Sequence, residues 1–194
     1  MFSYWERQSF FEFDHIVIGA GITGLSTAIE LKAVYPGETV LVLERGLIPA
    51  GASTRNAGFA CMGSVTELLD DLETMSEGEV VSLFQQRKTG LDILRKRLGD
   101  DAIGYASRGS YELIDENAKE ALNHIDYLNG LLLSINNKPS FSLANEKIRQ
   151  FGFGEKYTEA LIENTCEGEI NTGKMMKALV AYAMQCGVEI KTGA

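Results

Sequence analysis

The segment DHIVIGAGITGLSTA (residues 14–28), followed by VLVLER (residues 40–45), decides the fold. The apolar, β-branched run that ends at Gly19 predicts a buried parallel strand. Residues 22–35 then carry apolar side chains at helical spacing, and Pro36 predicts the end of that helix. The second apolar run predicts another buried strand. Strand, helix and strand within about thirty residues predict a βαβ unit.

Three glycines stand where the first strand turns into the helix. Gly19 permits a tight turn, Gly21 lets a pyrophosphate approach the backbone, and Gly24 lets the helix pack closely on the sheet. The free N–H groups of the helix N-terminus attract phosphate. Glu44 follows the second strand, where its carboxylate can accept hydrogen bonds from the adenosine ribose and would repel a 2′-phosphate. This spacing predicts a dinucleotide site and disfavours NADP.

Composition excludes several classes of protein. The 194 residues hold 18 Lys and Arg against 27 Asp and Glu, a net charge of −9, which disfavours binding to nucleic acid. No apolar run is long enough for a transmembrane segment. The three cysteines are scattered and only two histidines occur, so we expect reduced thiols, a cytoplasmic location and no metal site.

The fingerprint alone does not distinguish FAD from NAD, but the next loop does. Residues 51–58 read GASTRNAG directly after Glu44 and Arg45. With residues 14–28 and 40–45, this loop resembles the D-amino-acid-oxidase-like superfamily of FAD-dependent oxidoreductases. The resemblance continues more loosely through residues 108–113, 167–171 and 187–193. It implies FAD as the cofactor, with the loop leading into a helix that faces the pyrophosphate and flavin.

Carried over residue by residue, the resemblance assigns phosphate or flavin-ribose contacts to residues 52–54 and places residues 55–58 beside the isoalloxazine. The predicted cofactor-binding set is Gly19, Ala20, Gly21, Ile22, Thr23, Gly24, Glu44, Arg45, Ala52, Ser53, Thr54, Arg55, Asn56, Ala57 and Gly58. Some relatives attach flavin covalently through histidine or cysteine. No histidine occurs in residues 45–64, and Cys61 is interpreted as a buried free thiol, so we expect non-covalent FAD. Helix capping by Ser53 and Thr54 is the structural alternative.

The expected fold class is α/β, a Rossmann-type FAD-binding parallel sheet with a long helical and β insertion that forms part of an α+β substrate domain. Residues 1–64 and 165–194 would form an incomplete FAD-binding domain, and residues 65–164 the insertion. Within it we expect helices over 65–75 and 76–98, a hairpin of strands 103–106 and 110–114, and a helix from Asp115 to about Leu133. A short helix after Asn145, a strand at 157–163, a helix over 173–186 capped by Thr172 and a third parallel strand at 188–191 follow.

The resemblance implies that a substrate hydride passes to the flavin, which oxygen or another acceptor reoxidises. The substrate would be a small amine or amino acid; a 2-hydroxyacid, or a non-catalytic FAD-binding fragment, are the alternatives. No catalytic residue is assigned. Arg108 and Tyr111 fall in the expected hairpin, where an arginine can bind a carboxylate, although a simple turn charge is favoured. His124 is interpreted as a surface or half-buried residue of an amphipathic helix.

Two further expectations concern the ends of the chain. Six aromatic residues occur within residues 1–13, and we expect them to pack on the body of the protein. The parallel sheet offers only the 3-2-1 side of a doubly wound sheet, which predicts that these residues are the N-terminal half of a larger enzyme.

Overall fold

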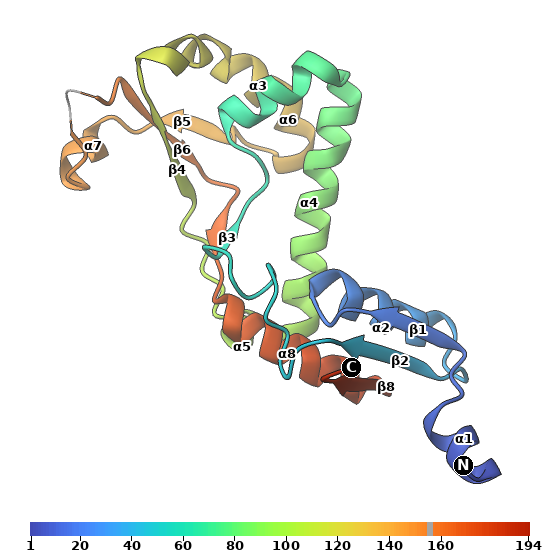
Figure 1. Ribbon diagram of the computed structural model, residues 1–194. Helices are drawn as coiled ribbons and strands as arrows, with labels where there is room; N and C mark the ends of the chain where they lie inside the picture. The colour runs from blue at the N-terminus through green and yellow to red at the C-terminus, as the bar shows by residue number, and fades with distance from the viewer. Residues whose placement is uncertain (155–156) are drawn as a thin grey trace. The chain divides into compact units, whose positions relative to one another are not determined.

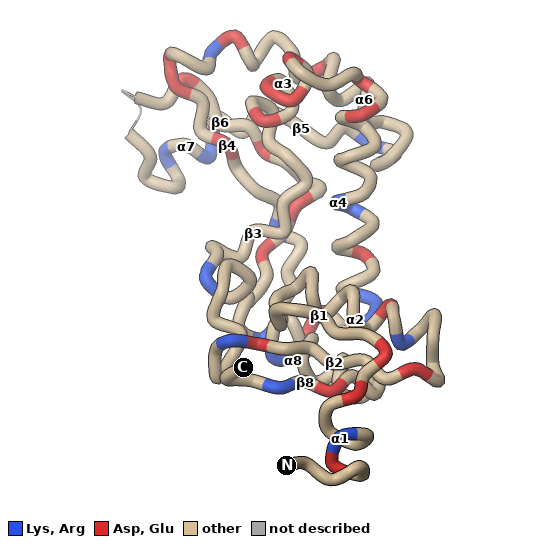
Figure 2. Tube along the Cα trace, turned by 45° about the vertical axis from the view of Figure 1, so that its right-hand side comes forward, with Lys and Arg blue, Asp and Glu red and all other residues tan. Residues whose placement is uncertain are grey.

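A computed structural model describes residues 1–154 and 157–194 (Figure 1). The chain divides into two compact units, each described here by itself. Unit 1 comprises Met1–Gly58, Asp101–Gly104 and Asn171–Ala194, and unit 2 comprises Phe59–Asp100 and Tyr105–Ile170. Lys and Arg positions are scattered along the trace (Figure 2). No helix within the described residues combines the length and apolarity needed to cross a bilayer.

Unit 1 contains the predicted βαβ unit. Strand β1 (His15–Ile18), helix α2 (Ile22–Val34) and strand β2 (Val40–Glu44) follow in order, and α8 (Thr172–Gln185) leads to β8 (Val188–Thr192). The three strands form a parallel sheet in the order β1-β2-β8. The expected third parallel strand is confirmed beside β2. The parallel sheet and the mixed α/β architecture agree with the expected fold class.

Strand β1 differs from its expectation of burial on both faces. Ile16 is 55% exposed and Ile18 is 77% exposed, whereas Val40 and Val42 of β2 are buried. Alternate side chains of a strand point to opposite faces, so a cover on one face protects only every second residue. Helix α2 packs on the other face, where Val17 lies close to Gly24. In the described residues, β1 also pairs with β2 alone, which leaves it at the sheet edge.

Unit 2 holds two small antiparallel sheets and a set of helices. One sheet has the order β4-β6-β5 and the other pairs β3 with β7. Its strands are β3 (Phe59–Ala60), β4 (Ser110–Ile114), β5 (Phe141–Leu143), β6 (Ala160–Asn164) and β7 (Gly168–Glu169). Its helices are α3 (Val65–Thr74), α4 (Glu77–Leu98), the 3-10 helix η1 (Glu116–His124), α6 (Ile125–Asn136) and α7 (Glu146–Gln150).

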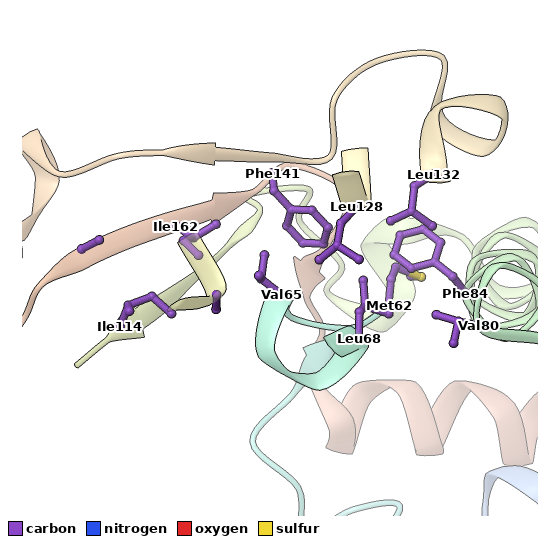
Figure 3. Close-up of a cluster of buried hydrophobic side chains, with 12 residues drawn as sticks. Met62, Val65, Leu68, Val80, Phe84, Ile114, Leu128, Leu132, Phe141 and Ile162 are labelled. Carbon is purple, nitrogen blue, oxygen red and sulfur yellow. The ribbon is translucent and has the colours of Figure 1, made fainter. Parts of the chain in front are cut away.

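The core of unit 2 gathers side chains from α3, α4, α6 and the larger sheet. Figure 3 shows Phe84 and Val80 of α4 near Leu68, Met62, Leu128 and Leu132, with Phe141 and Ile162 farther along the sheet. Phe84 is fully buried. A capping box begins α4, since the Ser76 hydroxyl accepts from Glu79 N and the Glu79 carboxylate accepts from Ser76 N. The helices expected over 65–75 and 76–98 are confirmed.

Other expectations in unit 2 need correction. Residues 103–106 form no strand: α5 (Asp100–Ile103) ends there, and Ala106 makes only an isolated bridge to Glu169. Strand β4 instead pairs with β6, because tertiary pairing with a distant strand replaced the local hairpin. The helix capped by Asp115 starts as the 3-10 helix η1 and becomes α-helical only at Ile125.

The boundaries of later elements also shift. The strand expected at 157–163 is β6, which begins at Ala160. The short helix after Asn145 is α7. Helix α8 is capped by Asn171 rather than Thr172, because the Asn171 side chain accepts from Lys174 N at 2.9 Å. Gly187, with φ of 86°, follows the C-cap Cys186 and ends α8.

Most of the aromatic N-terminal segment stays exposed, and its contact with the body of unit 1 includes Lys191, which donates to Phe10 O and lies over the half-buried Phe13 ring. The segment forms helix α1 (Tyr4–Phe10), which has a capping box between Ser3 and Glu6 and no buried residue. Tyr4 is 68% exposed and Trp5 is 72% exposed. The expectation of burial was wrong because this self-capped helix satisfies its own backbone, and its rings contact one another, as Tyr4 and Trp5 do edge to face with ring centroids 5.1 Å apart.

Candidate functional site: a dinucleotide cavity

A cavity of about 620 Å³ opens in unit 1 at the carboxyl ends of β1 and β2. Its wall combines the ends of two parallel strands, the first turn after β1 and the loop after β2. The lining residues are Ile18, Gly19, Gly21, Leu43, Glu44, Arg45, Gly46, Pro49, Ala50, Gly51, Ala52, Ser53 and Arg55. The carboxyl edge of an open parallel sheet is the usual place for a ligand in this architecture.

The fingerprint glycines serve different purposes. Gly19 has φ of 96°, a conformation that side chains rarely adopt, so the turn after β1 requires glycine. A Cβ on Gly24 would lie 1.9 Å from the Gly19 carbonyl oxygen, so only glycine permits the close packing of α2 on β1. Gly21 has an ordinary extended backbone, with φ of −77°. Glycine is therefore favoured at position 21 because a Cβ there would lie 3.0 Å from Ser53 Oγ, and not because of the backbone conformation.

Glu44 organises the turn that carries the fingerprint. Its Oε2 accepts from Ala20 N at 2.9 Å, and its Oε1 accepts from Gly46 N at 2.9 Å. The hydrogen bonds from Gly46 and then Ala20 lower the pKa of Glu44 below its ordinary value of 4.5. The carboxylate is half-buried in the cavity wall and charged at neutral pH.

Ser53 connects the loop after β2 to the first turn of α2. Its hydroxyl oxygen accepts from Ile22 N at 3.1 Å, and it lies 3.0 Å from the place where a Cβ on Gly21 would stand. Ser53 therefore stands at the positive end of the α2 dipole, the position that an anion favours. The Ser53 hydroxyl thus bonds the first turn of α2, and Ser53 also belongs to the cavity wall.

Residues 51–56 form hydrogen-bonded turns and not the helix that the resemblance implied. Thr54 Oγ1 donates to Pro49 O at 3.0 Å, and Asn56 Nδ2 donates to Ala52 O at 3.0 Å. Asn56 Oδ1 accepts from Gly58 N at 2.9 Å. These side chains satisfy the backbone locally, which is how Thr and Asn stabilise turns in place of a helix.

The structure brings together part of the predicted set. Seven predicted residues line the cavity: Gly19, Gly21, Glu44, Arg45, Ala52, Ser53 and Arg55. Two contribute a backbone N–H just behind the wall, Ala20 to Glu44 and Ile22 to Ser53. The others lie elsewhere: Thr23 on the outer surface of α2, Gly24 against Gly19, and Thr54, Asn56, Ala57 and Gly58 along the turn outside the lining.

Sequence reasoning missed other lining residues. Ile18 ends β1, Leu43 pairs with it in β2, and residues 49–51 complete the turn. Gly46 contributes a backbone N–H to Glu44. The alignment of the two strand ends in a parallel sheet was a signal for Ile18 and Leu43. Nothing in the local sequence indicates the fold-back of residues 49–51.

Unit 2 contains Arg108, Tyr111 and His124, the three polar residues that the sequence analysis discussed outside the cofactor site. Arg108 is exposed and pairs with Glu169, with 3.3 Å between Arg108 Nε and Glu169 Oε1. Tyr111 donates its hydroxyl to Glu163 at 2.8 Å, and His124 is exposed at the end of η1. Arg108 is therefore an exposed charged residue of a turn in this structure, paired with Glu169. No group of His, Cys, Asp and Glu within the described residues is arranged to hold a metal ion.

Glu167 is a buried carboxylate that the sequence did not single out. It is 5% exposed and accepts from Met62 N at 2.6 Å, Gly63 N at 3.0 Å and the Ser110 hydroxyl at 2.5 Å. A buried charge is stabilised when several donors converge on it. Glu167 thereby fixes the segment that follows β3 within unit 2.

Cys61 is exposed, which corrects its expected burial. It follows the short edge strand β3, where Met62 and not Cys61 points into the core. Partial desolvation of its sulfur and the carboxylates of Glu167 and Glu67 raise the pKa of the thiol. The thiol is therefore protonated at neutral pH and is a weak nucleophile.

Comparison with known proteins gives the family. The family described as FAD dependent oxidoreductase (DAO) matches residues 14–194. Gamma-glutamylputrescine oxidoreductase of Escherichia coli (strain K12) is 28% identical over 174 residues, which cover 88% of this chain and 35% of that protein. The chain thus spans about a third of the length of this curated relative.

Solved structures show the same fold. Glycine oxidase from Geobacillus kaustophilus has a TM-score of 0.67 and 20% identity, covering 93% of this chain and 46% of that chain. L-alpha-glycerophosphate oxidase from Mycoplasma pneumoniae, solved with FAD bound, has a TM-score of 0.67 and 18% identity, covering 93% and 44%. The family match over residues 14–194 shows that the chain belongs to the DAO family of FAD-dependent oxidoreductases.

Proposed function

We propose that the cavity in unit 1 binds FAD non-covalently, with the ADP moiety against the fingerprint turn. The observation that supports this most strongly is how the Glu44 carboxylate is hydrogen-bonded. Its two oxygens each accept one backbone N–H, and a carboxylate has about four acceptor positions. Two positions are left for the ribose hydroxyls, and the two backbone bonds hold the carboxylate in place for them.

The pyrophosphate would lie at the first turn of α2. Gly21 leaves this approach open, since a Cβ there would crowd Ser53 Oγ at 3.0 Å. The Ser53 hydroxyl accepts from Ile22 N, so its own hydrogen is available to a phosphate oxygen. Arg45 on the wall adds positive charge for the same group. These residues fit a dinucleotide by size and by charge.

Two features of the chain support a non-covalent flavin. The raised pKa of Cys61 keeps its thiol protonated, and a thiolate is the form that attacks. Histidine, the other residue used for attachment, does not occur in residues 45–64. We therefore propose a releasable flavin. Residues 1–64 and 165–194 would belong to the FAD-binding domain and residues 65–164 to the substrate domain.

We further propose oxidation of a small amine or amino acid by the whole protein. When bound, FAD supplies the acceptor for a hydride from the substrate. The name of the Escherichia coli relative, which is 28% identical, supports an amine substrate. A 2-hydroxyacid substrate is the second candidate, and the fold shared with L-alpha-glycerophosphate oxidase is compatible with it. Oxygen or another acceptor would take the electrons, and the dispersed free cysteines suit a cytoplasmic location.

The pH dependence of binding follows from Glu44. Its pKa is lowered in the folded state, so the stabilisation from its hydrogen bonds is present above about pH 4.5 and lost as pH falls through the lowered pKa. Between pH 6 and pH 8, which is more than one unit above the ordinary pKa of 4.5, Glu44 stays ionised. FAD affinity should therefore not change with Glu44 ionisation in this pH window.

The test is titration of FAD into the apoprotein, followed by flavin fluorescence, with Glu44→Ala, Glu44→Gln and the exposed acid Glu12→Gln as matched control. Loss of a charge-assisted hydrogen bond costs roughly 1.5–3 kcal/mol, so Glu44→Ala should weaken binding by about 10- to 150-fold. Glu44→Gln should weaken it as well, because its amide N–H₂ would face one of two backbone donors. Equal affinity in all four proteins would remove Glu44 from the site.

A further inference from the structure

A second cavity, of about 550 Å³, lies in unit 1 beside helix α8. It shares Pro49, Ala50 and Arg55 with the dinucleotide cavity, so the turn of residues 49–55 contributes to both. The lining residues are Ile48, Pro49, Ala50, Thr54, Arg55, Gly173, Met176, Lys177 and Val180. Cavities of a few hundred Å³ with mostly apolar walls are typical of small-molecule sites.

The cavity is held together by one hydrogen bond between its two walls. Thr172 Oγ1, at the start of α8, donates to Thr54 O at 3.2 Å. Met176, one turn later, is only 3% exposed and belongs to the lining. Ile48 opposite is 69% exposed, so an apolar ligand would cover side chain that water now contacts.

Every charged residue in this lining is a cation. Arg55 and Lys177 stand among nine lining residues that include no Asp or Glu, in a chain with 27 acids and 18 bases. In the described part of the chain, neither cation takes part in a salt bridge. Gly173 belongs to the first turn of the 14-residue helix α8, and Met176, Lys177 and Val180 continue the lining along the side of this helix.

We propose that this second cavity binds a small monocarboxylate with a compact apolar body. The apolar wall of Ile48, Met176 and Val180 would take the body, and Arg55 and Lys177 the carboxylate. A cationic ligand would meet two like charges, and a neutral apolar ligand would gain no electrostatic attraction from the exposed Arg55 and Lys177. This cavity adjoins the proposed FAD site and shares Pro49, Ala50 and Arg55 with it, so binding of the carboxylate and binding of FAD are tested separately.

The experiment uses the full 194-residue chain with [methyl-¹³C]methionine and follows the Met176 methyl signal, assigned with Met176→Leu. The probes are 4-phenylbutyrate and its uncharged analogue 4-phenylbutan-1-ol. We expect saturable movement of the Met176 signal with phenylbutyrate at roughly millimolar concentration, the scale for a ligand of this size. The alcohol should bind several-fold more weakly.

Lys177→Gln should weaken phenylbutyrate binding by about three- to fivefold, the scale of one exposed ion pair, and leave the alcohol unchanged. Lys177→Arg should restore binding. Lys174→Gln is the matched control, since it removes the same charge from the same helix at a residue outside the lining. Val180→Trp should block both probes by filling the cavity.

Four results would overturn the proposal. They are a Met176 signal that does not move, equal binding of acid and alcohol, an equal effect of Lys174→Gln and Lys177→Gln, and loss of phenylbutyrate binding when FAD saturates the chain. The last would make the second cavity part of the cofactor site. Failure of FAD to bind, with phenylbutyrate still bound at Met176, would instead refute the proposed function and leave this inference standing.

Discussion

Replacing Gly24 by alanine tests the packing on which the dinucleotide site depends. The added Cβ would lie 1.9 Å from the Gly19 carbonyl oxygen and 3.1 Å from its carbon. Real Cβ contacts stay beyond 3.0 Å, so α2 would have to move away from β1 by more than 1 Å. The obstructing atoms belong to the backbone and cannot rotate aside.

Two opposing effects set the magnitude. Overpacking of a core costs about 1–3 kcal/mol, and a rigid backbone obstacle places this case at the upper end. Alanine gains at most about 1 kcal/mol over glycine in helix propensity. The cost of the steric clash therefore exceeds the gain in helix propensity. Gly24→Ala should lower the unfolding free energy of unit 1 by about 2 kcal/mol, which is about 30-fold in the folding equilibrium.

Hydrogen exchange with mass spectrometry resolves the two units. Peptides from α2 and β1 in Gly24→Ala should lose protection by about that factor. The control is Gly90→Ala in the middle of α4, where an added Cβ meets no atom within 4 Å. That variant should gain about 0.5–1 kcal/mol of stability. Unchanged protection of α2 in Gly24→Ala would refute the close packing of this helix on the strand.

Three further predictions concern the cofactor and the core. Gly21→Val should fold but fail to bind FAD, since its Cβ would meet Ser53 Oγ at 3.0 Å; a folded variant with stoichiometric flavin would contradict the site. Acid precipitation of FAD-loaded protein should leave all flavin in the supernatant, for wild type and Cys61→Ser alike, whereas flavin in the wild-type pellet would show covalent attachment. Glu167→Gln should lower the unfolding free energy of unit 2 by about 1–3 kcal/mol in urea titrations, because three donors lose a buried carboxylate; an unchanged midpoint would show that these bonds contribute nothing.

The βαβ unit could be predicted because its signals are local. The strand, turn, helix and strand of residues 15–44 lie within one stretch, and each glycine constrains its own neighbours. The position of Glu44 followed from the length of the helix. Its second role, accepting from Ala20 and Gly46, could not be predicted, because it depends on how two turns meet at the sheet edge.

The features that the sequence did not reveal depend on distant partners. Strand β4 pairs with β6, about fifty residues later, so the local pattern near Arg108 suggested a hairpin that does not form. The carboxylate of Glu167 meets Met62 and Gly63 across more than a hundred residues. The exposure of Trp5 was missed because aromatic content predicts burial only where a partner surface exists.

Mapping FAD onto the chain by amide NMR tests the central claim most directly. FAD titrated into the ¹⁵N-labelled 194-residue protein should shift the backbone amides of Ala20, Ile22, Gly46 and Ser53 together, saturating at one FAD per chain. Amides of α4 in unit 2 serve as the internal reference and should stay in place. The absence of saturable shifts at the fingerprint turn, or shifts confined to unit 2, would contradict an FAD site in this cavity.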